Sequence, residues 1–400
     1  MTCAASKFAW LLLAGLVLPG CAAQSVTVDQ MNQWLASTRR QHESDPELAQ
    51  KIAGRQLSDR ATLAQLAHWE TELPGPQSHV ALLALFDASQ FLPLPQSQIV
   101  KIPPPSVPTR VAMLSKATNY VIRTVGKLPD FYATRQTLHF QEMTSLASNP
   151  WYRTTGTRVP PTALYLAGRW KGVVTYRDGA EVPFADAAAS APPPTAQGFT
   201  TTGEFGPILS VVLGDALHGK VEWAYWKLWF TSREAVFHYS VPQNQSHYSV
   251  QLRNFHPPIH LYPAYHGEIT LEPSTGAILR VTIIADLKPP VQRFRAEMMV
   301  IYAPVTIGGK TYICPVKAVA LSTIPLAKAH RDRKYAGPLQ TQLNDVTFTH
   351  YHKFRTDMII LPSAESISGK SLKRLIRRCA PAAIHHIPAF TPADTAPAPD

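Results

Sequence analysis

The sequence predicts an α+β fold in which a small N-terminal helical layer precedes a large, curved antiparallel β-sheet with a helix packed against it. Three observations support this class. Apolar residues recur at helical spacing up to residue 92, a proline-rich segment follows, and short aromatic and β-branched runs separated by tight turns dominate from residue 131. The 36 prolines and only 16% charged residues also favour loops and strand ends over a helical bundle.

Residues 1–23 have the order of features found in an export signal. Lys7 is followed by the apolar run 8–18, which is shorter than the roughly 20 residues that a membrane-spanning helix needs. Cleavage after Ala23 is one interpretation. The other is a lipoprotein signal, in which Cys21 becomes the lipid-bearing first residue. Both predict an exported protein of the periplasm or outer membrane, and the second adds a lipid anchor.

The charge balance limits the class of partner. The chain has 38 Lys and Arg against 27 Asp and Glu residues, a formal net charge of +11. Such an excess favours anionic partners, which outside the cytoplasm are phospholipid head groups, lipopolysaccharide or acidic polysaccharide. Nucleic acid is therefore not predicted as a partner, and the sequence indicates no particular protein partner.

The domain organisation follows from a change of hydrophobic period. Residues 28–92 contain short amphipathic helical segments, and residues 93–108, with six prolines, predict an extended linker. A helix is expected from about Thr109 to Val125. Residues 109–360 are expected to form this helix and the β-domain. Residues 361–400 are expected to form a basic amphipathic segment and a disordered tail.

The β-region contains at least ten short predicted strands, most of them joined by tight turns. Glu272–Gly276 is a predicted hairpin turn, and Gly308-Gly309 is another. A helix from about Gly206 to Leu217 is apolar nearly all round, as expected of a helix covered on more than one side. We expect it to pack against the sheet.

Three runs in the second half carry a resemblance to known proteins: YHGEITLEPSTGAILR at 265–280, YAPVTIGGKTYICP at 302–315 and LNDVTFTHYHKF at 343–354. They resemble a family of exported bacterial proteins with no assigned activity, over roughly residues 198–360. More loosely, a helix beneath a long antiparallel meander is similar to the outer-membrane lipoprotein carrier and its relatives. In those proteins a curved sheet closes over a helix to form an apolar cavity for acyl chains. The resemblance implies a half-barrel-like fold and export, and it implies no catalytic residue.

The helix and the aromatic strand that follows it are the candidate walls of a ligand cavity. The predicted ligand-lining residues are Leu209, Leu213, Trp223, Trp226 and Trp229. A solid core built from the same side chains is the competing interpretation. The expected ligand is a lipid or another acyl-bearing molecule, because burial of each CH₂ gains about 0.8 kcal/mol.

Histidines suggest two further sites, each with a plainer alternative. His266 and Glu268 share a strand face and could act as base and orienter, or could form cross-strand polar pairs. His350 and His352 could hold zinc or copper, or could be solvated. The sequence has no Gly-x-Ser-x-Gly elbow, phosphate loop or His-Glu-x-x-His run. We therefore predict no catalytic residue, no metal and no cofactor.

Two features near the C-terminus also remain open. After cleavage of the signal, Cys314 and Cys379 are the remaining cysteines, and an oxidising compartment would allow a disulfide between them. The segment Lys370–Arg378 has apolar residues at helical spacing and a basic opposite face. It could lie on an anionic membrane surface, or dock its apolar stripe on the sheet.

The favoured function is that of a non-enzymatic envelope protein which binds an apolar or amphiphilic ligand in its curved β-domain. The alternative is an envelope scaffold or protein-interaction module with a solid β-core. A hydrolase or metalloenzyme that uses the histidines is the third class.

Overall fold

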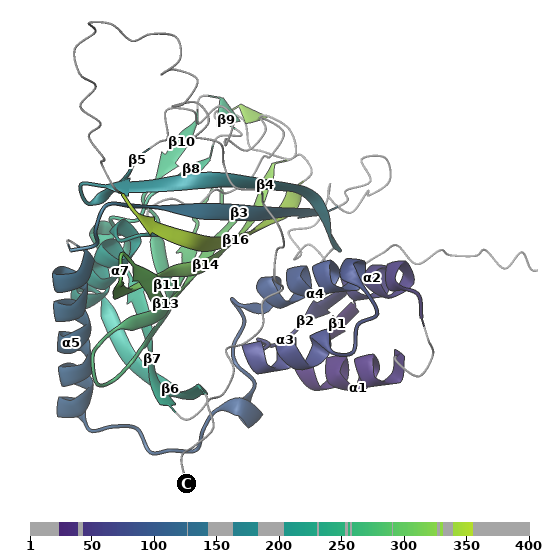
Figure 1. Cartoon of the computed structure of the whole chain (residues 1–400), viewed down its shortest axis with the longest axis horizontal. Coiled ribbons are helices and arrows are strands. Elements are labelled where there is room, and N and C mark those ends of the chain that lie inside the picture. Colours follow the sequence, from purple (N-terminus) through teal and green to yellow (C-terminus); the bar gives the residue numbers. More distant parts are fainter. Residues whose placement is uncertain are drawn as a thin grey trace, which may run out of the picture. The chain divides into compact units, whose positions relative to one another are not determined.

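The computed structural model describes residues 24–38, 43–125, 127–142, 163–182, 204–229, 232–252, 255–256, 258–289, 291–325, 329–330 and 339–354. Its architecture is α+β, with a ten-stranded antiparallel sheet that is not closed and helices packed against it (Figure 1). The predicted fold class is confirmed. The predicted export signal with Cys21, the segment Lys370–Arg378 and Cys379 lie outside the described residues.

The N-terminal region contains four helices: α1 (Val28–Thr38), α2 (Asp45–Ala53), α3 (Leu63–Glu70) and α4 (Pro76–Ser89). The start of α3 follows from local chemistry, because Thr62 and Gln65 cap each other's backbone N–H groups. Met31, Ile52 and Trp69 are completely buried in the core of this region. The region also holds a parallel strand pair, β1 (Gln24–Val26) and β2 (Arg55–Leu57). Three-residue strands are too short to show an alternating pattern, so they could not be predicted from the sequence.

The segment between the helical region and the sheet is less extended than its prolines suggest. It contains the short 3₁₀ helix η2 (Gln96–Gln98), and α5 (Val107–Val125) begins two residues before its expected start. Pro108 occupies the first turn of α5, where its missing N–H has no helical partner to lose.

The large sheet has the strand order β5-β4-β3-β16-β14-β13-β12-β11-β7-β6, and its neighbouring strands are antiparallel. Its strands are β3 (Phe131–Glu142), β4 (Leu164–Arg177), β5 (Ala180–Val182), β6 (Lys220–Trp229), β7 (Ser232–Val241), β11 (Ala264–Leu271), β12 (Ile278–Asp286), β13 (Arg295–Ile307), β14 (Lys310–Pro325) and β16 (Leu339–Lys353). The order follows the chain as a meander except at β3, which pairs with β16.

Short elements connect β7 to β11 and β14 to β16. They are the 3₁₀ helix η4 (Gln243–Gln245) and the strands β8 (Val250–Leu252), β9 (Phe255–His256), β10 (Ile259–Leu261) and β15 (Ala329–His330). β8 pairs with β10, and β9 pairs with β15, so these connections form two small ladders beside the large sheet.

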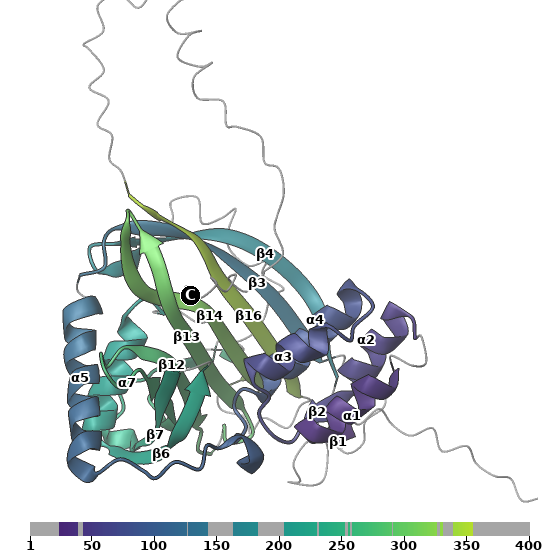
Figure 2. The ribbon, with the colours of Figure 1, turned by 60° about the horizontal axis from the view of Figure 1, so that its bottom comes forward.

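Helices pack against both faces of the sheet. Alternate side chains of each strand point to opposite faces, so each face contributes to a different core. The inner face is the one that packs against α5 and α7 (Pro207–His218), and Tyr239, Ile269 and Val281 belong to its core. The outer face packs against α4, where Ala84 contacts a cluster that includes Phe140. Figure 2 shows α5 and α7 on one side of the strands and α3 and α4 on the other.

The turn between β11 and β12 holds α5 against the sheet. Gly276 in this turn has φ +79°, a left-handed conformation that side chains with a Cβ rarely adopt. A Cβ at Gly276 would lie 2.6 Å from the backbone nitrogen of Ala117 in α5. Glu272 fixes the turn by accepting hydrogen bonds from the backbone N–H groups of Ser274 and Thr275.

The substitution Gly276→Ala is expected to destabilise the protein by about 3 kcal/mol, because it combines a left-handed backbone with an overlap against α5. Gly309→Ala is the matched control, since Gly309 has φ +81° and no described residue within 4 Å of an added Cβ. The control should lose only about 1–2 kcal/mol. Urea unfolding followed by tryptophan fluorescence measures both, and equal losses would contradict a tight contact between this turn and α5.

Candidate functional site

A groove of about 330 Å³ lies between the outer face of the sheet and the chain that follows α4. Strands β6, β7, β11 and β12 supply its floor, and residues 90–93 supply a wall. Its lining residues with a charged or imidazole side chain are Arg60, Lys220, Glu222, His238, His266 and Glu268. Its apolar lining residues are Phe91, Leu92, Pro93 and Ile284. The groove therefore joins a polar floor to an apolar wall.

Strand register brings the polar floor residues together. His238 on β7 lies directly opposite Glu268 on β11. His266 precedes Glu268 by two residues and so points to the same face of the sheet. The imidazole of His266 in turn pairs with Asp286 on β12, with 3.0 Å between Nδ1 and the carboxylate.

A glycine shapes the floor between these residues. Gly267 lies so close to β12 that a Cβ there would overlap the carbonyl oxygen of Thr282. Tyr239 lies opposite Gly267 and donates its hydroxyl hydrogen to that same carbonyl at 2.7 Å. The backbone N–H of Glu268 donates to the Thr282 hydroxyl at 2.8 Å. These contacts fix the backbone position from which the Glu268 side chain extends.

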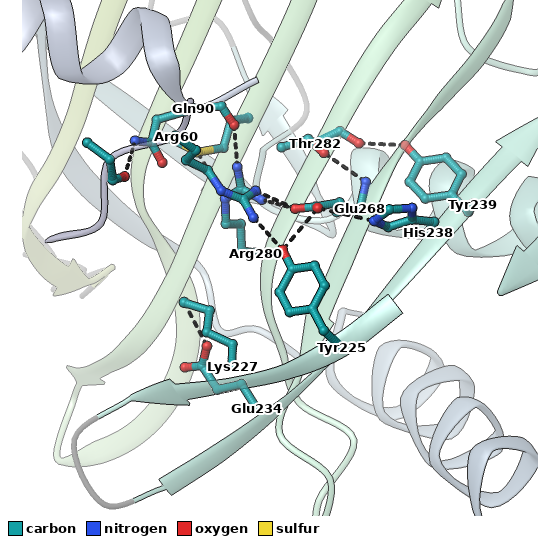
Figure 3. A network of polar contacts seen from close by, with 12 residues as sticks. Arg60, Gln90, Tyr225, Lys227, Glu234, His238, Tyr239, Glu268, Arg280 and Thr282 are labelled. Carbon is teal, nitrogen blue, oxygen red and sulfur yellow. Dashed lines mark hydrogen bonds and ion pairs between the residues drawn. The ribbon is translucent and has the colours of Figure 1, made fainter. Parts of the chain in front are cut away.

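The Glu268 carboxylate is the centre of a polar network (Figure 3). Its Oε2 accepts hydrogen bonds from Arg60 Nη1 at 2.5 Å and from Arg280 Nη1 at 2.9 Å. Its Oε1 accepts from the Tyr225 hydroxyl at 3.0 Å and lies 3.4 Å from His238 Nε2. Arg60 also donates to the Tyr225 hydroxyl. One carboxylate thus contacts two guanidinium groups, which leaves an excess positive charge.

The same network fastens the helical region to the sheet. Arg60 belongs to the loop before α3, whereas Arg280 and Glu268 belong to the sheet. Arg280 Nη2 donates to the carbonyl of Gln90 at 2.6 Å, and Gln90 Nε2 donates to the carbonyl of Ala61 at 3.0 Å. The side chains of Arg60, Arg280 and Glu268 are only 8%, 10% and 16% exposed, so these charges depend on one another.

The network shifts the pKa of each of its members. Burial alone would raise the pKa of Glu268, but contacts with His238, Arg60 and Arg280 outweigh it and hold that pKa far below its usual range. The hydrogen bond to Glu268 raises the pKa of His238. Burial, and then the nearby Arg60 charge, lower the pKa of Arg280 to about 10. Burial raises the pKa of Tyr225 to about 12. Glu268 therefore stays ionised at neutral pH.

A second buried ion cluster also joins α4 to the outer face. Lys317 Nζ lies 3.1 Å from the carboxylate of Asp87 on α4 and 2.5 Å from that of Asp345 on β16. Burial raises the pKa of Asp87 to about 8, although the Lys317 charge opposes this shift. At neutral pH the carboxyl group of Asp87 that faces Lys317 is therefore mostly protonated.

None of the five predicted ligand-lining residues is among the described residues that line the groove. Leu209 and Leu213 are buried in the core between α7 and the inner face. Trp223 and Trp226 pack edge to face, with ring centroids 4.8 Å apart, in a cluster beneath α5. The side chain of Trp229 is outside the described part of the structure.

The structure also arranges the predicted histidine sites differently from the way the sequence suggested. His266 and Glu268 share a face as expected, but each pairs with another residue rather than with the other. A β-bulge between Thr349 and His352, with His350 at φ +52°, interrupts the alternation on which a shared face for His350 and His352 depended. Among the residues that the structure describes, no group of three or more His, Cys, Asp or Glu is placed to hold a metal ion.

Cys314 is a free thiol buried in the inner-face core, as far as the described residues extend. Burial raises the pKa of this thiol to about 12. Its predicted partner Cys379 lies outside the described residues, so the disulfide stays a prediction.

Sequence reasoning missed Arg60 and Arg280, the two residues that give the network its excess charge. A signal for Arg280 is present, because it is the one charged residue in the mostly apolar run 278–284 of β12. Such a charge predicts a buried ionic partner. Arg60 has no comparable signal, since it lies in a loop 208 residues from Glu268.

No known protein family, curated protein or solved structure matches this chain. Within the described ranges, no helix combines the length and the apolar character needed to cross a membrane. Fold and site together define an α+β protein with an open ten-stranded sheet and, on its outer face, a groove lined by both charged and apolar side chains.

Proposed function

We propose that this protein is a non-enzymatic, exported binding protein of the cell envelope, and that its groove binds the anionic end of a small amphiphilic ligand. The charge balance at Glu268 supports this most directly. Two buried guanidinium groups share one carboxylate, so an additional anion near Arg60 would meet an uncompensated positive charge. The export signal predicted in residues 1–23 supports the envelope location.

The apolar wall supports an amphiphile over a simple anion. Phe91, Leu92 and Pro93 stand beside the polar floor, and Ile284 adds an apolar side chain to the floor itself. Small-molecule sites enclose about 300–1,000 Å³. At about 330 Å³ the groove fits a head group and the first carbons of a chain.

The lowered pKa of Glu268 supports binding rather than acid–base catalysis. A general base works best with a pKa near the operating pH. The pKa of Glu268 is held far below that range, and both of its oxygens already accept hydrogen bonds. Its role in the proposed function is to hold Arg60 at the groove.

The proposal is tested by titrating the full chain with 11-(dansylamino)undecanoic acid, a fluorescent amphiphile that carries a carboxylate. We expect a saturable rise in fluorescence that decanoate reverses and decanol does not. Ile284→Trp, which fills the groove, should weaken probe binding by about tenfold or more, because it removes apolar contact and space.

Val173→Trp is the matched control, since Val173 is 43% exposed on β4 and does not line the groove. It should leave probe binding unchanged. Absence of probe binding would overturn the proposal and favour the scaffold function. Equal effects of the two tryptophan variants would place the probe elsewhere on the protein.

A further inference from the structure

The outward side of α5 is a second surface, separate from the groove. One side of this helix is buried through Met113, Ala117 and Val121, which face the sheet and α7. In Figure 1 and Figure 2 the sheet and α7 lie on that side only, within the described part of the chain.

Large apolar side chains lie on the opposite side. Val107, Val111 and Ile122 are 62%, 60% and 72% exposed. Val111 and Ile122 are eleven residues apart, which is close to three helical turns, so they line up along the helix. The distance from Val107 to Ile122 along the axis is about 22 Å. The three side chains thus form a row rather than the compact central cluster typical of protein–protein anchors.

The charges of this segment have one sign. Residues 88–129 contain no Asp or Glu, and their basic residues are Lys101, Arg110, Lys116, Arg123 and Lys127. Lys116 and Arg123 are exposed and seven residues apart, so they form a basic row, which lies about a third of a turn around the helix from Val111 and Ile122. A row of exposed apolar side chains next to a basic row is typical of helices that lie in the surface of an anionic membrane.

We propose that the outward side of α5 docks on an anionic lipid surface. Val107, Val111 and Ile122 enter the head-group region, and Lys116 and Arg123 contact lipid phosphates. This inference does not depend on the groove, and it holds or fails independently of the proposed ligand.

Vesicle flotation of the purified full chain tests the docking surface. The vesicles contain phosphatidylcholine with 30 mol% phosphatidylglycerol, or phosphatidylcholine alone. We expect binding to the anionic vesicles only. The double variants Lys116→Glu/Arg123→Glu and Val111→Asp/Ile122→Asp should each weaken that binding roughly tenfold or more. All four positions are exposed, so unfolding midpoints should stay unchanged.

Lys171→Glu/Lys310→Glu makes the same charge change at exposed positions on β4 and β14 and should alter binding less than twofold. An equal loss with this control would show attraction by net charge and overturn a specific role of α5. Lys373→Glu/Arg377→Glu examines the basic C-terminal segment. If only this variant releases the protein from vesicles, or if both α5 variants bind normally, the proposal is wrong.

Discussion

Replacing Glu268 by alanine is expected to lower the free energy of unfolding by about 3–5 kcal/mol, because two buried guanidinium groups would lose their shared counter-charge. Arg60 and Arg280 are 8% and 10% exposed, and both donate to the same oxygen of Glu268. Urea unfolding at pH 7 measures the loss.

Glu222→Ala provides the control, since Glu222 also lines the groove and pairs with Lys220 but is 60% exposed. Its expected cost is below about 1 kcal/mol. The pH dependence gives a second readout. Because the folded-state pKa of Glu268 is lowered, its stabilising effect is present above the unfolded value near 4.5 and is lost as pH falls toward the folded value. A Glu268→Ala variant as stable as Glu222→Ala would show that the network contributes little.

Replacing Asp87 by asparagine is expected to reduce the fall in stability between pH 4 and pH 8 by about 2–5 kcal/mol. Burial raises the folded-state pKa of Asp87 from 3.8 to about 8. Between these values the folded protein keeps a proton that the unfolded chain releases. The stabilising effect is therefore complete below about 3.8 and is lost as pH rises through about 8. The asparagine amide would not titrate, so unfolding curves at pH 4.5, 6 and 8 should move closer together.

Asp345→Asn is the informative comparison, because it leaves Lys317 with a carboxyl group that is mostly protonated at neutral pH. This variant should be destabilised at pH 7, whereas Asp87→Asn should not. If the two variants have the same pH profile, the raised pKa of Asp87 is not what controls the pH dependence of stability.

Local chemistry explains why much of the fold was predictable. The helix expected at Gly206–Leu217 is observed at Pro207–His218, because a dense apolar run follows a proline at its start. The hairpin turn expected at Glu272–Gly276 is observed as well, because a left-handed glycine and a capping carboxylate define it within five residues. Signals of this kind need no knowledge of distant chain segments.

The candidate site depends on contacts that no local pattern contains. Arg60 reaches Glu268 only because the loop before α3 packs against the outer face. The sequence indicates correctly that Glu268 and His266 share a face, but their partners come from β7 and β12 and depend on strand order. The surroundings of Trp223 and Trp226 could not be predicted for the same reason, because they pack in a cluster with residues of α5.

The pairing of β3 with β16 has a consequence for how the protein reaches its folded state. His139 and Asn344 are hydrogen-bonded across this junction although they are 205 residues apart in the chain. During synthesis from the N-terminus, β3 and β4 would be complete long before β16 appears. Contacts over such separations close slowly, and an unpaired strand edge can meanwhile pair with another chain. β16, the last strand of the described residues, thus joins the two parts of the sheet, so the waiting time for β16 is the period in which a nascent molecule is most exposed to misassembly.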